Sequence, residues 1–237
     1  MLSARRLTEK YALGQRNFDR ADLKEAQMSG LHFKSARFCW ADFTSAQLSE
    51  AELDECNLTG AMMWRVGLQS ASCRWINLHQ ATMVRCEAAH ANFTGANFHR
   101  TDLRLADLRK ANFAGADLRG AKLCYSDLRG ADLTGADLTG ADLTGTNLME
   151  AQMKAVCWRA ATLHRAQLEG AQLNRAQKEG AQLDDAQLDN AQRSNAQREG
   201  AKQGNGLFGL GAVSVRKPPA SEESTKVLQD AENLAAC

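Results

Sequence analysis

A period of five residues runs through most of this sequence and limits the folds that are open to it. From Arg16 to Gly200 the chain reads as 37 consecutive pentads without insertion or deletion, and the word ADLTG occurs three times in a row over residues 131–145. The third position of the pentad is Leu, Phe or Met in 31 of the 37, and the first position is Ala in 27. Such a regular internal period indicates a repeat architecture rather than one or two ordinary domains.

Neither an α-helix nor one long strand can bury the third-position residues together. In a helix, Leu133, Leu138 and Leu143 would each rotate by roughly 140° from the last, so no apolar stripe forms. In a strand, an odd period places successive leucines on opposite faces. The pattern works if the chain turns a corner once per pentad and coils around an axis. We therefore expect these leucines and their equivalents to form the core, with the first-position alanines beside them.

The fifth position carries the residues expected at such a corner. Twelve of the 18 glycines occupy it, as a turn with positive φ favours. Both prolines, Pro218 and Pro219, lie outside the repeat, which fits stacked coils that need their backbone N–H groups for hydrogen bonds. Asp or Asn at the second position is a good local acceptor for backbone N–H groups near a turn.

The unbroken A(D/N)LxG pattern resembles that of the pentapeptide-repeat family. The resemblance covers about four-fifths of the chain and implies an all-β solenoid, a right-handed quadrilateral β-helix with four pentads per coil. Residues 16–200 would then make about nine coils, and a strand spacing of roughly 4.8 Å gives a rod on the order of 45 Å long. In such a rod Phe18 stacks on Phe38, and Phe93 on Phe113, because residues four pentads apart become interior neighbours.

The two ends of the chain depart from the repeat. Residues 1–15 are typical of a short amphipathic helix that starts at Ser3 and caps the first coil. Past about residue 175 the interior positions become Lys178, Arg193 and Arg198, and a buried charge without a partner is costly, so we expect the β-helix of 16–200 to fray there. Residues 201–237 read as a linker and a tail that can end in a short helix. This tail can cap the last coil or hold a second copy of the chain as a homodimer, and the sequence does not choose between these roles.

The composition limits the compartment and the partners. The formal net charge is +1, so no global field favours nucleic acid or an anionic membrane. The sequence has no run of 18 apolar residues and no apolar leader, so we expect a cytoplasmic protein, with export by a specialised machine left open. Seven cysteines without a CxxC pair indicate free thiols rather than a disulfide framework.

The charged residues of the regular part are balanced in place. Asp107 and Asp127 fall in one column, four pentads apart, where like charges repel. Arg109 and Arg129, two residues further along the same face, offset that repulsion. We expect a solvated face there rather than a site.

The sequence shows no catalytic constellation. His79 and His99 fall in one outward column with Cys39, but two imidazoles do not make a metal site. Cys124 and Cys157 are expected to face outward, and neither has an activating base in its pentad. The glycines of the repeat follow its five-residue period and match no phosphate-binding loop motif. We therefore predict no enzyme activity, no cofactor and no metal.

Departures from the repeat supply the candidate partner-binding residues. Between residues 56 and 90 several interior positions hold Cys, Val or Ile, which is consistent with simple repacking of small apolar residues. Outward positions there and one coil earlier hold Trp, which they do not require, and exposed Trp is enriched at interfaces. Packing of these rings against the terminal segments is the alternative. The candidate residues are Trp40, Trp64, Trp75, Leu207, Phe208 and Leu210.

Three functions are consistent with these observations. The first is a non-catalytic protein-binding or scaffold protein, whose partner is another protein and which contacts neither membrane nor nucleic acid. The second, which the resemblance implies, is a DNA gyrase or topoisomerase modulator that acts by DNA mimicry; the near-zero net charge disfavours it because mimicry needs a negative surface. The third is an adaptor or effector of a bacterial secretion system.

Overall fold

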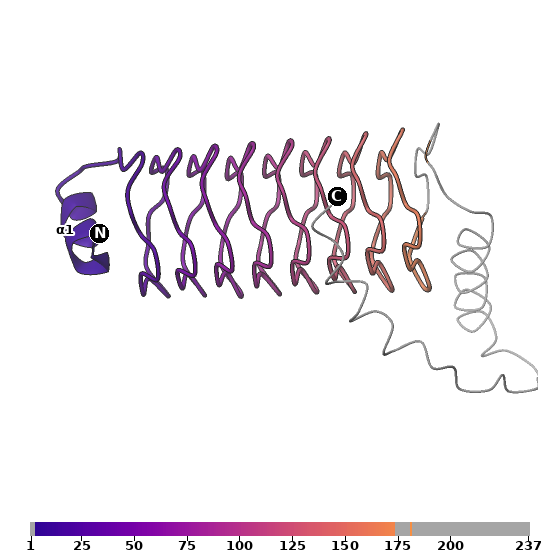
Figure 1. Ribbon diagram of the computed structural model, residues 1–237, viewed down its shortest axis with the longest axis horizontal. Helices are drawn as coiled ribbons and strands as arrows, with labels where there is room; N and C mark the ends of the chain where they lie inside the picture. Colours follow the sequence, from indigo (N-terminus) through magenta and orange to yellow (C-terminus); the bar gives the residue numbers. More distant parts are fainter. Residues whose placement is uncertain (1–2, 174–180, 182–237) are drawn as a thin grey trace, which may run out of the picture. The chain divides into compact units, whose positions relative to one another are not determined.

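The computed structural model describes residues 3–173 and residue 181. The chain divides into two units, Met1–Lys202 and Gln203–Cys237, and all described residues belong to the first. In that unit one helix, α1 (Ala4–Ala12), precedes a stack of coils that begins near Arg16 (Figure 1). The predicted fraying between 175 and 200, the ninth coil and the tail over 201–237 lie outside the described residues, apart from Ala181.

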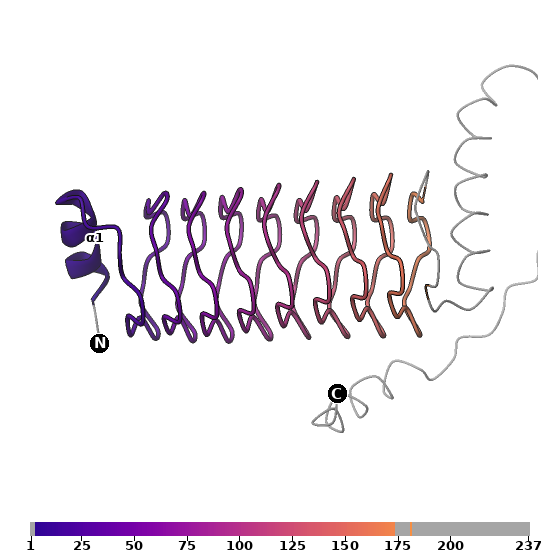
Figure 2. The same ribbon diagram turned by 90° about the horizontal axis from the view of Figure 1, so that it is seen from above.

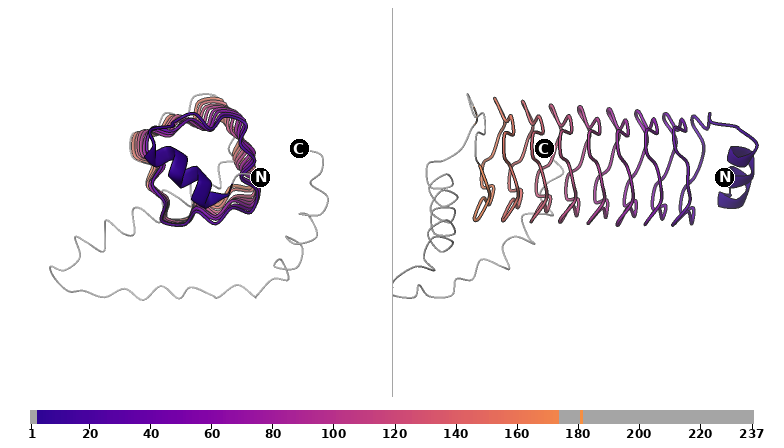
Figure 3. Two further views of the ribbon diagram at one scale, coloured as in Figure 1. Left: turned by 90° about the vertical axis from the view of Figure 1, so that its left-hand side faces the viewer. Right: turned by 180° about the vertical axis from the view of Figure 1, so that it is seen from behind.

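Each coil takes four pentads. The second residue of each pentad forms a parallel bridge with its equivalent four pentads further along, from Asn17–Arg37 to Gln152–Gln172, and the strands are only these single bridge residues. At each bridge, backbone hydrogen bonds connect the two adjacent coils. For example, Arg37 N–H donates to the Arg16 carbonyl at 2.7 Å, and Phe18 N–H donates to the Arg37 carbonyl at 2.8 Å. The coils are evenly spaced along a common axis (Figure 2) and superimpose on a four-sided outline when viewed end-on (Figure 3).

Every corner is a turn whose fifth residue adopts the left-handed conformation. From Arg20 to Gly170 each fifth residue has φ between 52° and 72°. The N–H of the next residue donates to the carbonyl three residues earlier, as Ala21 does to Phe18 at 3.1 Å, which fits a type II turn. Glycine fills 10 of these 31 corners, and the other 21 hold side chains that rarely adopt this conformation. The glycine pattern therefore marks the corners, although most of the corners form without it.

The interior consists of the third and first residues of each pentad, as the period predicts. Leu133, Leu138 and Leu143 are fully buried, and so are most of the first-position alanines. Where a polar residue replaces the alanine, its hydroxyl bonds to the backbone: Thr101 Oγ1 donates to the Leu78 carbonyl at 2.7 Å. The core therefore tolerates such substitutions without leaving a buried hydroxyl unpaired.

The predicted stacking of phenylalanines is confirmed. Phe18 lies over Phe38 with ring centroids 5.3 Å apart and an interplanar angle of 20°. Phe93 lies over Phe113 at 5.2 Å and 22°. Both pairs are interior neighbours in adjacent coils, as a coil of four pentads requires.

α1 lies against the interior of the first coil. Ser3 Oγ accepts a hydrogen bond from Arg6 N–H at 3.3 Å, which makes Ser3 the N-cap. Leu7 is fully buried, and the Tyr11 hydroxyl donates to the Lys34 carbonyl at 2.9 Å. The apolar side of the helix thus covers side chains that an open coil would expose. Neither α1 nor any other part of the described chain has the length and hydropathy of a membrane-spanning helix.

Candidate protein-binding surface

The coils present four faces, which we number along the chain. The first pentads of the four faces are 16–20, 21–25, 26–30 and 31–35, and each later pentad lies on the same face as the equivalent pentad of the coil before it. Coils are counted in blocks of four pentads from Arg16, so that the third coil is 56–75. This frame assigns every outward side chain to a face and a coil.

Large apolar side chains are exposed at five described positions, and three of these gather around the second face. Trp40, at the corner that leads into this face, is 55% exposed, and Met62 and Trp64, one coil further, are each 47% exposed. Trp75 is 57% exposed at the corner between the fourth and first faces, and Leu13 follows α1. The three tryptophans singled out in the sequence therefore all project outward, but they do not form one cluster.

Aromatic side chains at three corners cover a glycine of the next coil. The pairs are Trp40–Gly60, Trp75–Gly95 and Tyr125–Gly145. A Cβ added to Gly60 would collide with the Trp40 ring, and one added to Gly95 would fall 2.6 Å from the Trp75 ring. Each ring thus occupies the place that a side chain at the next corner would fill. This contact is a structural reason for Trp40 and Trp75 that the sequence reasoning missed.

Trp75 also adjoins an ion pair between two coils. Asp54 is buried and accepts hydrogen bonds from Arg74 Nε at 2.8 Å, from Arg74 N–H at 2.9 Å and from Ser72 Oγ at 2.7 Å. Burial raises the pKa of Asp54, but the hydrogen bonds from Arg74 and Ser72 outweigh it and hold the pKa below its ordinary value. The Arg74 guanidinium lies 5.7 Å from the centroid of the Trp75 ring, within cation–π range. Trp75 is therefore part of a local scaffold.

Apolar residues continue from Trp64 along the second face. Val84, one coil further at the same pentad position, is buried, and Leu105 and Tyr125 are partly exposed. We call this set the apolar stripe; it runs over coils two to six and consists of Trp40, Met62, Trp64, Val84, Leu105, Cys124 and Tyr125. The alignment is visible only once each coil is known to hold four pentads.

The expectation that Cys124 faces solvent is wrong. This residue is only 2% exposed, and its thiol forms a hydrogen bond with Asp142 that lowers the pKa of that carboxyl. Cys39, which shares the fourth position, is also buried. Short fourth-position residues differ in exposure, since Ser29 is exposed and Ala89 is partly exposed, whereas Cys39 and Cys124 are buried.

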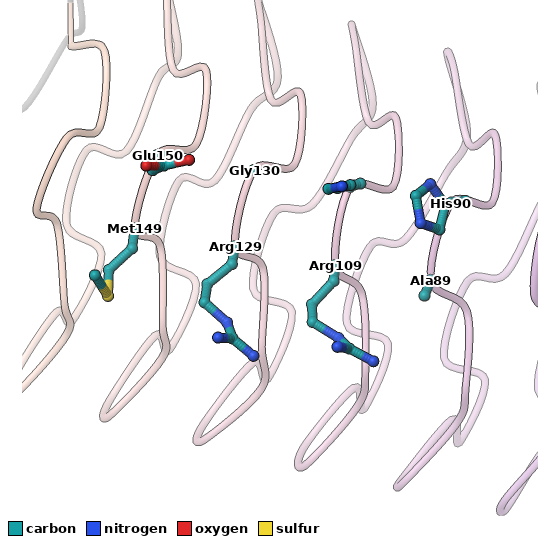
Figure 4. Close-up of a pocket in the computed structure, with 8 residues that line it drawn as sticks. Ala89, His90, Arg109, Arg129, Gly130, Met149 and Glu150 are labelled. Atoms are coloured by element: carbon teal, nitrogen blue, oxygen red, sulfur yellow. The ribbon is translucent and has the colours of Figure 1, made fainter.

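A shallow depression of about 570 Å³ lies where the third face meets the fourth, lined by turn residues of four coils: Ala89, His90, Arg109, Lys110, Arg129, Gly130, Met149 and Glu150. Figure 4 shows Arg109 and Arg129 side by side on neighbouring coils. Arg109 Nη2 lies 2.6 Å from Asp107 Oδ2, and Arg129 Nη2 lies 2.6 Å from Asp127 Oδ2. Arg109 Nε also lies 3.9 Å from Asp127 Oδ2. The predicted charge balance is confirmed, and it leaves these two guanidinium groups poorly suited to bind an anion.

The described cysteines are free thiols that differ in reactivity. Burial raises the pKa of Cys56 and of Cys86 to about 12, so neither is an effective nucleophile at neutral pH. Cys157 is partly exposed, as predicted. Its burial raises the pKa, but hydrogen bonds from the Thr139 hydroxyl and from Arg159 outweigh that effect and lower it. No general base is apparent beside it among the described residues.

The two histidines of the first face lie close together. The rings of His79 and His99 are 5.2 Å apart, edge to face, on adjacent coils. Cys39, two coils before His79, is buried. Nowhere in residues 3–173 do three or more His, Cys, Asp or Glu side chains come together in a way that could hold a metal ion.

Comparison with known proteins agrees with this geometry. The family model for pentapeptide repeats matches eight copies over residues 21–60, 71–109 and 111–153. A trypsin-treated variant of QnrB1, described as a plasmid-mediated fluoroquinolone resistance protein, is similar in structure with a TM-score of 0.60 and 17% identity, over 81% of this chain and 96% of that chain. HetL, a pentapeptide repeat protein involved in heterocyst differentiation regulation from the cyanobacterium Nostoc sp. strain PCC 7120, is 26% identical over 77% of this chain and 95% of its own, with a TM-score of 0.40. No curated protein matches the sequence.

The family model defines the family, and the similarity to QnrB1 defines the fold. The similarity to QnrB1 shows a shared architecture, the right-handed β-helix solenoid that the repeat implied. The family match spans just over half of the sequence and falls on the coils described above. The chain belongs to the pentapeptide-repeat family.

Proposed function

We propose that this protein is a non-catalytic binding or scaffold protein that contacts another protein through the second face of its coils. The observation that carries the proposal is the exposure of Met62 and Trp64, two residues apart on one face. Large apolar side chains exposed together on a rigid surface are typical of protein interfaces, and Trp contributes strongly to binding there. Trp64 occupies the fourth position of its pentad, and the equivalent residue one coil further is Val84 rather than a glycine. Trp64 therefore lacks the glycine contact that Trp40 and Trp75 make.

The proposal extends to the organisation of the whole chain. We assign residues 1–15 to a capping helix, residues 16–200 to a β-helix of about nine coils, and residues 201–237 to a tail. The tail residues Leu207, Phe208 and Leu210 are a second candidate contact surface, for a partner or for a second copy of the chain. The cytoplasm is the proposed compartment.

Co-purification with mass spectrometry tests the second face directly. Tagged wild-type protein, Trp64→Ala and Met149→Ala are expressed in the source organism at equal levels. Met149 is the control because it occupies the same fourth position on the third face. We expect Trp64→Ala to reduce recovery of the partner by about fivefold or more, as loss of a central Trp contact predicts. Met149→Ala should leave the recovery unchanged. Equal recovery with Trp64→Ala and wild type removes the second face from the proposal.

The alternative of a gyrase modulator is ranked second. It is motivated by the resemblance and by the similarity to QnrB1, a fluoroquinolone resistance protein, which at 17% identity extends to the fold alone. DNA mimicry requires a dense negative surface, whereas the net charge of this chain is +1. A gyrase supercoiling assay with excess protein decides the matter, and unchanged supercoiling eliminates this alternative. A role in a secretion system is ranked third, and a gene position among unrelated metabolic genes would count against it.

A further inference from the structure

The second face of coils three to five concentrates positive charge around its apolar centre. This patch comprises residues 60–65, 80–85 and 100–105, which are the three pentads and the corner residue before each. Its charged residues are Arg65, Arg85, Arg100, Asp102 and Arg104. Four arginines and one aspartate give a net charge of +3, whereas the whole chain carries +1. The whole chain is nearly neutral, but positive charge is concentrated around the exposed Met62 and Trp64.

Most of these cations remain available to a partner. Arg104 is held by Asp102, with Nη2 2.8 Å from Oδ2. Arg65, Arg85 and Arg100 are exposed, and none of them lies within ion-pair distance of a described acidic side chain. Guanidinium groups are suited to bind carboxylates through two parallel hydrogen bonds. The patch therefore offers three cations for charged contacts.

These arginines border the apolar residues on both sides. Arg65 and Arg85 occupy the corner that leads into the third face, with φ of 52° and 56°. Arg100 occupies the opposite corner, in the same column as Trp40. Between the two corners lie the outward residues Met62 and Trp64. An apolar centre with a charged rim is the usual arrangement of a protein interface.

The backbone of this face cannot accept an added strand. Met63 N–H donates to the Thr82 carbonyl at 2.8 Å, and Thr82 N–H donates to the Ala61 carbonyl at 2.9 Å. The bridging N–H and C=O groups thus point along the stack and are used between coils. A partner that binds by β-augmentation needs a free edge, so a partner on this face must bind through its side chains.

We propose that this patch docks an amphipathic, acidic helix of a partner protein; the inference rests on the protein-binding function proposed above. A helix parallel to the coil axis would pack its apolar side on Met62 and Trp64. Asp or Glu residues along its two borders would pair with Arg100 on one side and with Arg65 and Arg85 on the other. Three coils at a spacing of roughly 4.8 Å match two to three helical turns of roughly 5.4 Å. Leu105 and Tyr125 follow Arg65 and Arg85 in the same corner column and extend this border with apolar contacts.

A protein helix fits this patch better than nucleic acid does. Binding of nucleic acid depends on many phosphate contacts, and three cations on a chain of net charge +1 supply few. The exposed Met62 and Trp64 instead offer apolar area that the apolar side of a docked helix would bury. The arginines then steer the encounter and select acidic partners.

A matched pair of synthetic peptides tests the proposal with the full-length protein. The first probe is a fluorescein-labelled helical peptide of about 17 residues whose Leu side is bordered by Glu, long enough to cover three coils; the second has Lys in place of every Glu. Binding is followed by fluorescence anisotropy. We expect the Glu peptide to bind wild-type protein, and the Lys peptide to bind at least about tenfold more weakly because its charges face the arginines.

Three variants locate the site. Arg65→Glu combined with Arg85→Glu should weaken binding of the Glu peptide by about tenfold or more, and Trp64→Ala by about fivefold. Arg165→Glu is the control, because Arg165 is exposed at the same corner of the second face, with φ of 58°, on the eighth coil. It should leave binding unchanged, and circular dichroism checks that all variants fold.

Three outcomes would overturn the proposal. The first is equal binding of the Glu and Lys peptides. The second is a loss of Glu-peptide binding with Arg165→Glu as large as that with Arg65→Glu and Arg85→Glu. The third is binding of a short single-stranded DNA that is tighter than that of the Glu peptide and depends on the same arginines. If neither peptide binds while Trp64→Ala still reduces recovery of a cellular partner, the protein-binding function stands and the acidic helix is refuted.

Discussion

Replacement of Gly60 by alanine tests whether the Trp40 ring packs on the coil beside it. Gly60 has φ of 65°, and a Cβ built on it collides with the Trp40 ring. Gly135 has φ of 69° at the same fifth position of a pentad, with no atom within 4 Å of an added Cβ. The two substitutions therefore share the backbone strain and differ in the aromatic contact.

The expected magnitudes follow from these two terms. A non-glycine residue in the left-handed conformation costs about 1 kcal/mol, so Gly135→Ala should lower the free energy of unfolding by about that amount. Gly60→Ala must in addition displace the Trp40 ring from the backbone that it covers. Inserting a methyl group into an occupied space typically costs a further 1–3 kcal/mol, roughly. We expect a total of about 2–4 kcal/mol for Gly60→Ala.

Urea denaturation followed by far-UV circular dichroism measures both effects. A double-mutant cycle with Trp40→Ala separates them: in that background Gly60→Ala should lose only the backbone term, which gives a coupling energy of about 1–3 kcal/mol. Equal destabilisation by Gly60→Ala and Gly135→Ala, or additivity in the cycle, would refute the packing of ring on glycine.

The ion pair of the buried Asp54, the helix and the thiols give three other tests. Asp54→Asn should lower the free energy of unfolding by about 2 kcal/mol at pH 7, because Arg74 loses a buried charged partner. Because folding lowers the pKa of Asp54, this contribution is complete above the ordinary carboxyl pKa and is lost as pH falls through the folded-state value, so the difference in Tm from wild type should shrink below about pH 4. Leu7→Ala should cost about 2–4 kcal/mol and speed amide hydrogen exchange in the first coil. Iodoacetamide should alkylate Cys157 well before Cys73, whose burial raises its thiol pKa.

Matched positions serve as controls for these tests. Asp117→Asn removes a more exposed pair with Arg119 and should change stability by less than about 1 kcal/mol; a loss as large as that of Asp54→Asn would contradict the importance of burial. Leu13 is 87% exposed, so a large effect of Leu13→Ala would argue against a specific role for Leu7. Peptide mapping by mass spectrometry identifies the alkylated thiols, and rapid labelling of Cys73 would contradict its burial.

The five-residue period predicted the interior correctly, because only a chain that turns once per pentad buries the third residue of each pentad together with the others. It could not predict how outward side chains rest on their neighbours. The sequence predicts an exposed Cys124, yet this side chain is buried, while Ser29 at the same position of its pentad is exposed. A usable signal for the aromatic contacts was present: Trp40 precedes Gly60, and Trp75 precedes Gly95, by one complete coil.

The candidate surface depended on the coil length in the same way. Met62, Trp64, Leu105 and Tyr125 are scattered in the sequence, and they are seen to share one face only when residues four pentads apart are superimposed. Trp64 is recognisable in the sequence from its type and its position in the pentad, whereas the other three residues are not. The arginines beside the stripe are not apparent in the nearly neutral charge of the whole chain, because their excess exists only on one face.

One turn per pentad also governs how such a chain can change in length. Deletion of residues 141–145 would keep the spacing of every interior residue, yet everything after that point would shift by one side of the square. Insertion of four pentads would add a complete coil and leave every later side chain pointing in its former direction. Length changes of a single pentad thus preserve the interior while rotating the downstream surface by a quarter turn. Among related chains, gaps between residues that serve one surface should therefore come in whole coils, while gaps elsewhere need only come in whole pentads.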